Sequence, residues 1–145
     1  MNITKNTLAE LVSYLEDLKK ILSNAHLDKK IYKEGTKLNQ VAFHASQSVI
    51  YYLRTFVLNE DYKRDREIEY NSTHSLEEIN SSIDLSLQVC NKIIDKKLEL
   101  TAPLKKTKTV YSRNIEVTTV YEILQHVTAH TAEHFGEINN ALREN

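Results

Sequence analysis

The chain has 145 residues, of which 41% are hydrophobic and 27% are charged, a composition typical of globular proteins. It contains only two glycines and one proline, too few for the turns of a many-stranded sandwich or barrel, so we expect an all-α fold. The net charge of −1, from 19 basic and 20 acidic residues, argues against a nucleic-acid-binding surface. The length fits a single domain over residues 1–145.

The sequence also indicates where the protein works. No apolar run approaches the ~20 residues that a membrane-spanning helix needs, so we expect no membrane partner. The N-terminal segment lacks the apolar core of a signal peptide. The single cysteine, Cys90, cannot form an internal disulfide, and a reducing cytoplasm is therefore the expected compartment. We interpret Cys90 as a small buried hydrophobic residue rather than a reactive thiol or a metal ligand.

Hydrophobic residues at intervals of three and four predict four long helices, over residues 4–24, 37–58, 75–97 and 119–143. Thr7, Ser75 and Thr119 are each followed three residues later by glutamate, which predicts capping boxes, and the one at Thr7 leaves a slightly later start of the first helix open. Gly35 and Thr36 predict the turn and N-cap before the second helix. The buried stripe of the third helix is predicted to be Leu76, Ile79, Ile83, Leu87, Cys90 and Ile94.

Two connections are long. Residues 59–74 carry charges of both signs, which we interpret as a solvated surface. Fully extended, they cover ~50 Å, more than the ~33 Å of a 22-residue helix. They can therefore run the length of a bundle and place the third helix parallel to the second. Residues 98–118 form either a short hairpin or an extended strap, able to wall one side of a site. Residues 49–58 are apolar on nearly all sides, which indicates deep burial or a dimer interface.

The last predicted helix carries three histidines spaced by four, namely His126, His130 and His134. Each such step turns a helix by only ~40° and climbs ~6 Å, so the three side chains project from one side. His134 lies in the centre of the apolar stripe and His130 on its flank. Buried imidazoles without partners cost free energy, and a shared metal ion explains both most simply.

The pattern from His130 to His134, with Glu133 between them, fits the H-x-x-E-H motif of inverted zinc peptidases. Only eleven residues follow His134, so a third ligand has to come from upstream, and we interpret the peptidase match as coincidental. His44, at the core edge of the second helix, is the best upstream candidate. His26 and His74 lie in connections near helix ends.

His126 is the rival to His44. It lies ~80° around the helix from His134 and ~12 Å from it along the axis, too far for one ion. We therefore expect His126 behind the ligands, at the pocket rim or on the surface. Glu133 and Glu137 are the nearest carboxylates in sequence for moving a proton or orienting a histidine. We interpret both as exposed helix residues.

Residues 37–44 and 120–138 resemble the DinB-like family of four-helix bundles, and the similarity covers essentially the full length. Its most specific part is a histidine pair spaced by four, then any residue, then glycine, here His130, His134 and Gly136. Family members often have glutamine after this glycine, where this chain has Glu137, and they usually have a tryptophan at the entry to helix 2, which this chain lacks.

The resemblance implies an up-down-down-up helix order with a long crossover between helices 2 and 3, and frequent dimers. It also implies a divalent metal ion, zinc or nickel, held by His44, His130 and His134. Related branches include bacillithiol transferases and mycothiol-dependent maleylpyruvate isomerases.

We therefore hypothesise a homodimeric, divalent-metal-dependent enzyme with thiol S-transferase-like or hydrolase-like chemistry on a small molecule. A low-molecular-weight thiol is the expected partner of the transferase chemistry. The alternative is a non-enzymatic, metal-stabilised or ligand-binding helical bundle that acts as a dimer. Turnover of a thiol and an electrophile would separate the two hypotheses.

Overall fold

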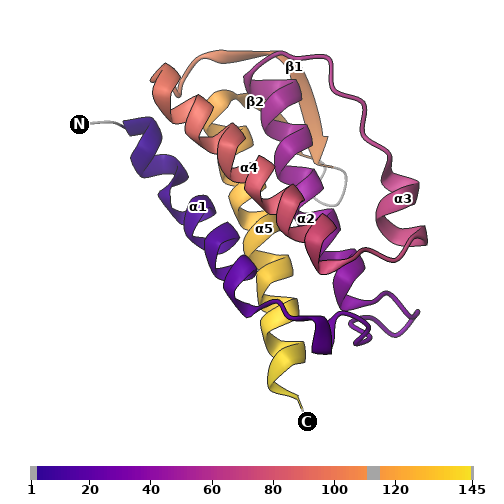
Figure 1. The fold of residues 1–145 in the computed structure, drawn as a ribbon. Helices are drawn as coiled ribbons and strands as arrows, with labels where there is room; N and C mark the ends of the chain where they lie inside the picture. Colours follow the sequence, from indigo (N-terminus) through magenta and orange to yellow (C-terminus); the bar gives the residue numbers. More distant parts are fainter. Residues whose placement is uncertain (1–2, 111–114, 145) are drawn as a thin grey trace.

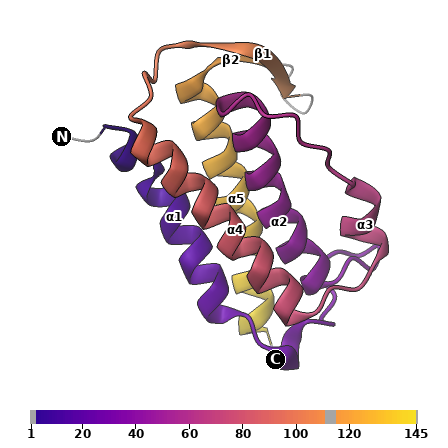
Figure 2. The same ribbon diagram turned by 45° about the horizontal axis from the view of Figure 1, so that its top comes forward.

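The structure is a computed structural model that describes residues 3–110 and 115–144. Within these residues the protein is mostly helical, as expected from its composition. Figures 1 and 2 show the long helices packed side by side as a bundle, with a hairpin across one end. The long helices are α1 (Ile3–Ile21), α2 (Leu38–Tyr52), α4 (Leu76–Lys96) and α5 (Val120–Arg143).

Shorter elements connect the long helices. A π-helical turn continues α2 without a break, so the second predicted helix extends to residue 57. Figure 1 shows the crossover after this turn running back along the bundle, outside α2, to the start of α4. The short elements are η1 (Asn24–His26), η2 (Leu53–Val57), α3 (Arg66–Asn71), β1 (Pro103–Val110) and β2 (Ile115–Thr119).

The predicted N-caps of two helices are confirmed. The hydroxyl of Ser75 accepts a hydrogen bond from the backbone N–H of Glu78 at 3.1 Å. The hydroxyl of Thr119 likewise accepts from the N–H of Glu122 at 3.2 Å. Each hydroxyl satisfies one of the N–H groups that a helix start leaves without an intrahelical partner.

The other two predicted caps are wrong, although each helix begins within one residue of its predicted start. α1 already begins at Ile3, and the Thr7 hydroxyl donates to the Ile3 carbonyl at 2.9 Å instead of capping a helix. The N-cap of α2 is Lys37, one residue after Thr36, and its backbone N–H donates to Oε1 of Gln40 at 2.8 Å. Gly35 forms the predicted turn with φ of 104°, a conformation that glycine adopts without steric cost.

The buried face of α4 differs from the predicted stripe. Ser82 and Ser86 are buried, whereas Leu76, Leu87 and Ile94 are only partly buried. The Ser82 hydroxyl lies 2.6 Å from the hydroxyl of Ser46 on α2. Small side chains that bond to each other let α2 and α4 approach closely, and the face of α4 that carries the two serines therefore packs against α2. The predicted stripe was wrong in leaving out the serines and in counting Leu76, Leu87 and Ile94 as buried.

The apolar segment 49–58 is used inside the chain. Ile50, Leu53, Phe56 and Val57 are all buried among the described residues. The η2 turn contacts α4, α5 and β1, which together cover it. Deep burial is therefore the observed alternative, and the segment offers little apolar surface to a second copy of the chain.

Residues 98–118 contain a hairpin rather than an extended strap. β1 and β2 pair antiparallel, with Lys108 opposite Val117 and Val110 opposite Ile115. Residues 111–114, between the two strands, lie outside the described residues. The hairpin contacts η2 and the start of α5.

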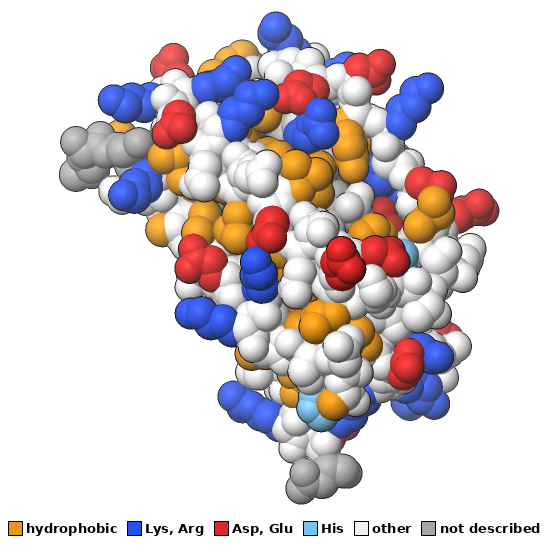
Figure 3. Space-filling model, viewed as in Figure 1, with side chains coloured by type: hydrophobic (Ala, Val, Ile, Leu, Met, Phe, Trp, Pro, Cys, Tyr) orange, Lys and Arg blue, Asp and Glu red, His pale blue; other side chains and the backbone are white. Residues whose placement is uncertain are grey.

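Two surface properties agree with the composition. No helix among the described residues is both long and apolar enough to cross a membrane. Figure 3 shows acidic and basic side chains interspersed over the face in view.

Candidate metal centre

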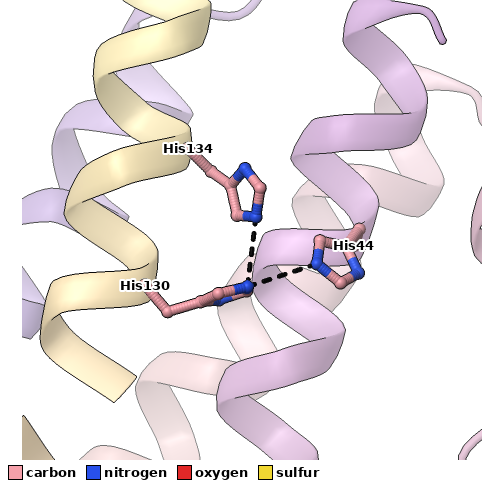
Figure 4. A group of neighbouring side chains, drawn as sticks. All are labelled: His44, His130 and His134. Atoms are coloured by element: carbon pink, nitrogen blue, oxygen red, sulfur yellow. Dashed lines mark hydrogen bonds between the residues drawn. The ribbon is translucent and has the colours of Figure 1, made fainter. Parts of the chain in front are cut away.

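His44, His130 and His134 meet between two helices, as Figure 4 shows. His44 comes from α2, and the other two histidines lie on adjacent turns of α5. Nε2 of His130 lies 3.4 Å from Nε2 of His44 and 3.1 Å from Nε2 of His134. His44 and His134 are buried and His130 is partly buried. The fold thus brings together the three histidines that the sequence analysis selected.

The environment of His44 determines which of its ring nitrogens carries the proton. Nδ1 lies 2.8 Å from Oε1 of Glu69 and 3.1 Å from Nη2 of Arg64. Nη2 has two hydrogens, and it donates to Oε1 of Glu69 at 2.7 Å and to Oγ of Ser48 at 2.8 Å. A carboxylate can only accept. Nδ1 of His44 therefore donates to Glu69, and Nε2 presents its lone pair to the other histidines.

Glu69 is a buried carboxylate that stays ionised. Burial alone would raise its pKa, but hydrogen bonds from Arg64 and His44 outweigh burial and lower the pKa below its usual value. Arg64 grips both carboxylate oxygens, with Nε donating to Oε2 at 2.7 Å. Burial, reinforced by His134 and the Arg64 charge, lowers the pKa of His44 although Glu69 opposes the shift. His44 is therefore neutral at neutral pH, as a metal ligand must be.

His134 is oriented in the same way by a second carboxylate. Its Nδ1 donates to Oε1 of Glu137, one helical turn along, at 2.7 Å. The hydroxyl of Tyr32 lies 3.4 Å from the same nitrogen. Burial and a hydrogen bond to Glu137 raise the pKa of Tyr32, so its phenol keeps its proton. Nε2 of His134 is thus also left with a lone pair directed at the centre.

His130 differs from its two neighbours. Its Nδ1 is buried and has no hydrogen-bond partner among the described residues. Burial, with the adjacent His134 and His44, lowers its pKa to about 3, so the ring is neutral. No carboxylate fixes its tautomer, and its Nε2 is free to take up a metal ion with the proton on Nδ1.

The donor set fits a divalent metal ion. Two nitrogens are held as lone-pair donors and a third can join them, which is the set of neutral imidazoles that zinc and nickel accept. For metal–nitrogen bonds of about 2.1 Å, the edge of a tetrahedron is about 3.4 Å. Two of the three separations, at 3.4 and 3.1 Å, are close to this edge, and all three ligand atoms lie within 4.8 Å of one another. Without an ion, the three Nε2 atoms lie close together with at most one proton among them, the one that His130 can carry on Nε2.

The other candidates from the sequence lie outside the triad. The His126 ring is 6.4 Å from the His130 ring and 5.2 Å from that of Tyr52, measured between centroids. His126 is therefore a neighbour of the site, as expected. Glu133 is exposed, as predicted, but the same prediction for Glu137 was wrong because its side chain turns toward His134.

Sequence reasoning missed the residues that surround His44. Segment 59–74 was interpreted as solvated surface, yet the Glu69 side chain is 1% exposed and that of Arg64 is 6% exposed. Tyr70 from the same segment packs its ring 4.8 Å from the His44 ring, and burial raises its pKa to about 12. Nothing in a mixed-charge segment distinguishes these residues from their exposed neighbours. For Glu137, the spacing of three from His134 was the available signal.

The chain was compared with known families, curated proteins and solved structures. No curated protein and no solved structure matches it. The sequence pattern of the DinB family matches residues 7–145, essentially the whole chain. With the four long helices and the clustered histidines of α2 and α5, this match shows that the chain belongs to the DinB family.

Proposed function

We propose that the protein is a divalent-metal-dependent enzyme that acts on a small molecule. The observation that carries this proposal is the convergence of three imidazoles from two helices, two of them oriented by carboxylates. When bound, a zinc or nickel ion supplies a Lewis acid that lowers the pKa of a water or thiol in the remaining position. Three protein ligands with one open position are typical of catalytic rather than structural zinc sites.

The charges around the triad support an anionic fourth ligand. Arg64 contributes one positive charge, and Glu69 and Glu137 contribute one negative charge each. With a doubly charged ion, this group has a net charge of +1. A single negative charge neutralises it, so the chain's own residues favour a thiolate or a hydroxide in the open position. Between these two, the thiol-dependent enzymes in related branches of the family favour a thiolate, and thus S-transfer to an electrophile.

Three finer parts of the proposal have less support. The crossover that returns along the bundle supports the up-down-down-up helix order (Figure 2). Homodimer formation stays a prediction, because the apolar segment that suggested it is covered within the chain. A cytoplasmic location is proposed on the single cysteine alone. The non-enzymatic alternative has no observation of its own in its favour.

The first test is a metal analysis of protein purified without a polyhistidine tag. We expect nearly one zinc or nickel ion per chain by plasma mass spectrometry. His44→Ala, His130→Ala and His134→Ala should each lose the ion, because two imidazoles hold it too weakly to survive purification. The matched control, His126→Ala, should keep it.

Two outcomes would contradict this proposal. A wild type that binds neither ion, even after zinc or nickel is added, would exclude a metal-dependent enzyme of this form. Equal loss of metal from the His126→Ala protein would exclude the triad as the ligand set. If the metal is confirmed, turnover of low-molecular-weight thiols with electrophiles would be compared with hydrolysis of esters and amides.

A further inference from the structure

The crossover between η2 and α4 is attached to the bundle mainly by polar contacts. Its short helix α3 has a single buried residue, the charged Glu69, and its apolar Ile68 is 48% exposed. Further along, Nε2 of Gln40 on α2 donates to the backbone carbonyls of Tyr70 and Ser72, at 2.7 and 3.3 Å. With little apolar area buried, the docking of α3 depends on the bonds made by Glu69.

Glu69 is held from three directions. Arg64 binds both of its carboxylate oxygens, in the forked geometry that gives the strongest protein ion pairs. His44 donates to Oε1. The backbone carbonyl of Glu69 accepts a hydrogen bond from Nε2 of His74 at 3.1 Å. The buried His74 ring in turn stacks on the Phe43 ring, with their centroids 3.9 Å apart. A carboxylate held this firmly can fix the orientation of the ring it contacts.

We propose that Glu69 and Arg64 are positioning residues of the metal centre, through which metal binding and docking of the crossover stabilise each other. This inference rests on the proposed function, since it assigns a role toward the same ion. Glu69 accepts the hydrogen bond from Nδ1–H of His44, which keeps the proton on Nδ1 and the lone pair on Nε2. Arg64 keeps Glu69 in place. The two hydrogens of its Nη2 are donated to Glu69 and Ser48 and not to Nδ1 of His44. Without Glu69, the proton can move to Nε2, which then points at the other histidines and blocks the ion.

The coupling has to act in both directions. If docking of the crossover raises the metal affinity by a given factor, metal binding raises the stability of the docked crossover by the same factor. Carboxylates that orient metal-bound histidines typically contribute 10- to 100-fold to metal affinity. We expect a factor in this range.

The first test compares Zn²⁺ and Ni²⁺ affinities by competition with a coloured chelator. Glu69→Ala, which removes the acceptor for Nδ1 of His44, should bind about 10- to 100-fold more weakly than the wild type. Glu67→Ala is the matched control, because it makes the same change at an exposed position of the same short helix. Arg64→Gln and its exposed counterpart Arg66→Gln form a second matched pair, with a loss expected only for Arg64→Gln.

The second test measures the positioning itself in the metal-free protein. Long-range proton–nitrogen NMR spectra identify the tautomer of each histidine. His44 should carry its proton on Nδ1 in the wild type and in Glu67→Ala, and should lose this preference in Glu69→Ala, which has no acceptor at this position. A merely structural role for Glu69 would leave the tautomer of His44 unchanged in a folded variant.

The third test needs no variant and therefore does not depend on the folding of Glu69→Ala. Amide hydrogen exchange of the wild type is followed with and without Zn²⁺. Exchange in residues 64–71 should slow on binding, by a larger factor than in α1, which does not contribute to the centre. Equal affinities of Glu69→Ala and the wild type would overturn the inference, as would unchanged exchange in 64–71. In both cases the metal site itself would stand, whereas a wild type that binds no metal overturns the proposed function as well.

Discussion

Two glutamates on α5, one helical turn apart, show how finely the candidate metal centre is specified at the level of single residues. Glu137 reaches Nδ1 of His134 at 2.7 Å, and Glu133 is exposed. Glu137 follows His134 by three residues and lies on the same side of the helix, so its carboxylate can reach the His134 ring. Glu133 directly precedes His134 and points to solvent. Family members often have glutamine at this position, whose amide oxygen can also accept the Nδ1 proton. The carboxylate adds a negative charge to the same contact.

We predict that Glu137→Gln weakens metal binding by less than 10-fold, whereas Glu137→Ala weakens it by about 10- to 100-fold. Glutamine keeps an acceptor for the Nδ1 proton of His134 and loses only the charge, but alanine removes the acceptor. Chelator competition with Zn²⁺ measures both. Glu133→Ala is the control and should bind like the wild type. Equal affinity of Glu137→Ala and Glu133→Ala would show that Glu137 does not orient the histidine.

Cys90 gives a prediction that concerns the core and not the metal. The side chain is fully buried, and burial raises the pKa of its thiol to about 12. At pH 8, only about one thiol in ten thousand is then ionised, and it is shielded from reagents. Native protein should not react with an aromatic disulfide reagent over an hour, and should react fully in denaturant. Fast labelling of the native protein would contradict the structural role of Cys90.

At the level of elements, α2 and α4 are joined by a polar contact between small residues. The Ser82 hydroxyl bonds to Ser46 at 2.6 Å and accepts from Nε2 of Gln47 at 2.9 Å. Ser86 donates to the backbone carbonyl of Ser46 at 2.9 Å. This contact sets the distance between α2 and α4. Because α2 also carries His44, the same contact helps to fix where His44 lies in the candidate metal centre.

We predict that Ser82→Leu destabilises the protein by about 1–3 kcal/mol, because a larger side chain has to force the two helices apart and the polar contact is lost. The neighbouring Ser81 is exposed, and Ser81→Leu should change stability by no more than about 0.5 kcal/mol. Urea unfolding followed by circular dichroism measures both. A similar small effect of the two substitutions would mean that the helices have room at this contact.

The long helices could be predicted from the sequence because their apolar residues repeat with the helical period, a local property. The α4 stripe was wrong at the serines, because periodicity counts residue types and does not detect two serines bonded across helices. The crossover was misinterpreted for a related reason. Glu69 and Glu67 are equivalent in sequence, and only the packing of α3 on α2 makes one a buried ion pair and the other exposed. The histidine pair of α5 was predictable because both ligands share one helix face, whereas His44 could be joined to them only by elimination and by the family resemblance.

At the level of the whole molecule, the candidate metal centre joins parts that are distant in the chain. His44 lies on α2, His130 and His134 on α5, and the residues that orient them come from the crossover and from α5 itself. Tyr32, from the connection between η1 and α2, contacts the same group. An ion bound here holds α2, α5 and the crossover together. Metal binding is therefore expected to be linked to the stability of the entire fold.

We predict that a metal ion at 100 times its dissociation constant stabilises the wild type by about 2.7 kcal/mol. For a chain of this length, this corresponds to a rise in Tm of roughly 8 °C. His130→Ala should show little or no rise in Tm, since the ion loses the ligand whose Nε2 lies between those of His44 and His134. His126→Ala should show the full rise, because its ring lies outside the triad. The measurement is calorimetry with and without Zn²⁺, and each protein is compared with itself, so the cost of the substitution cancels. An equal rise in His130→Ala would show that the ion binds elsewhere and would separate the histidine cluster from metal binding.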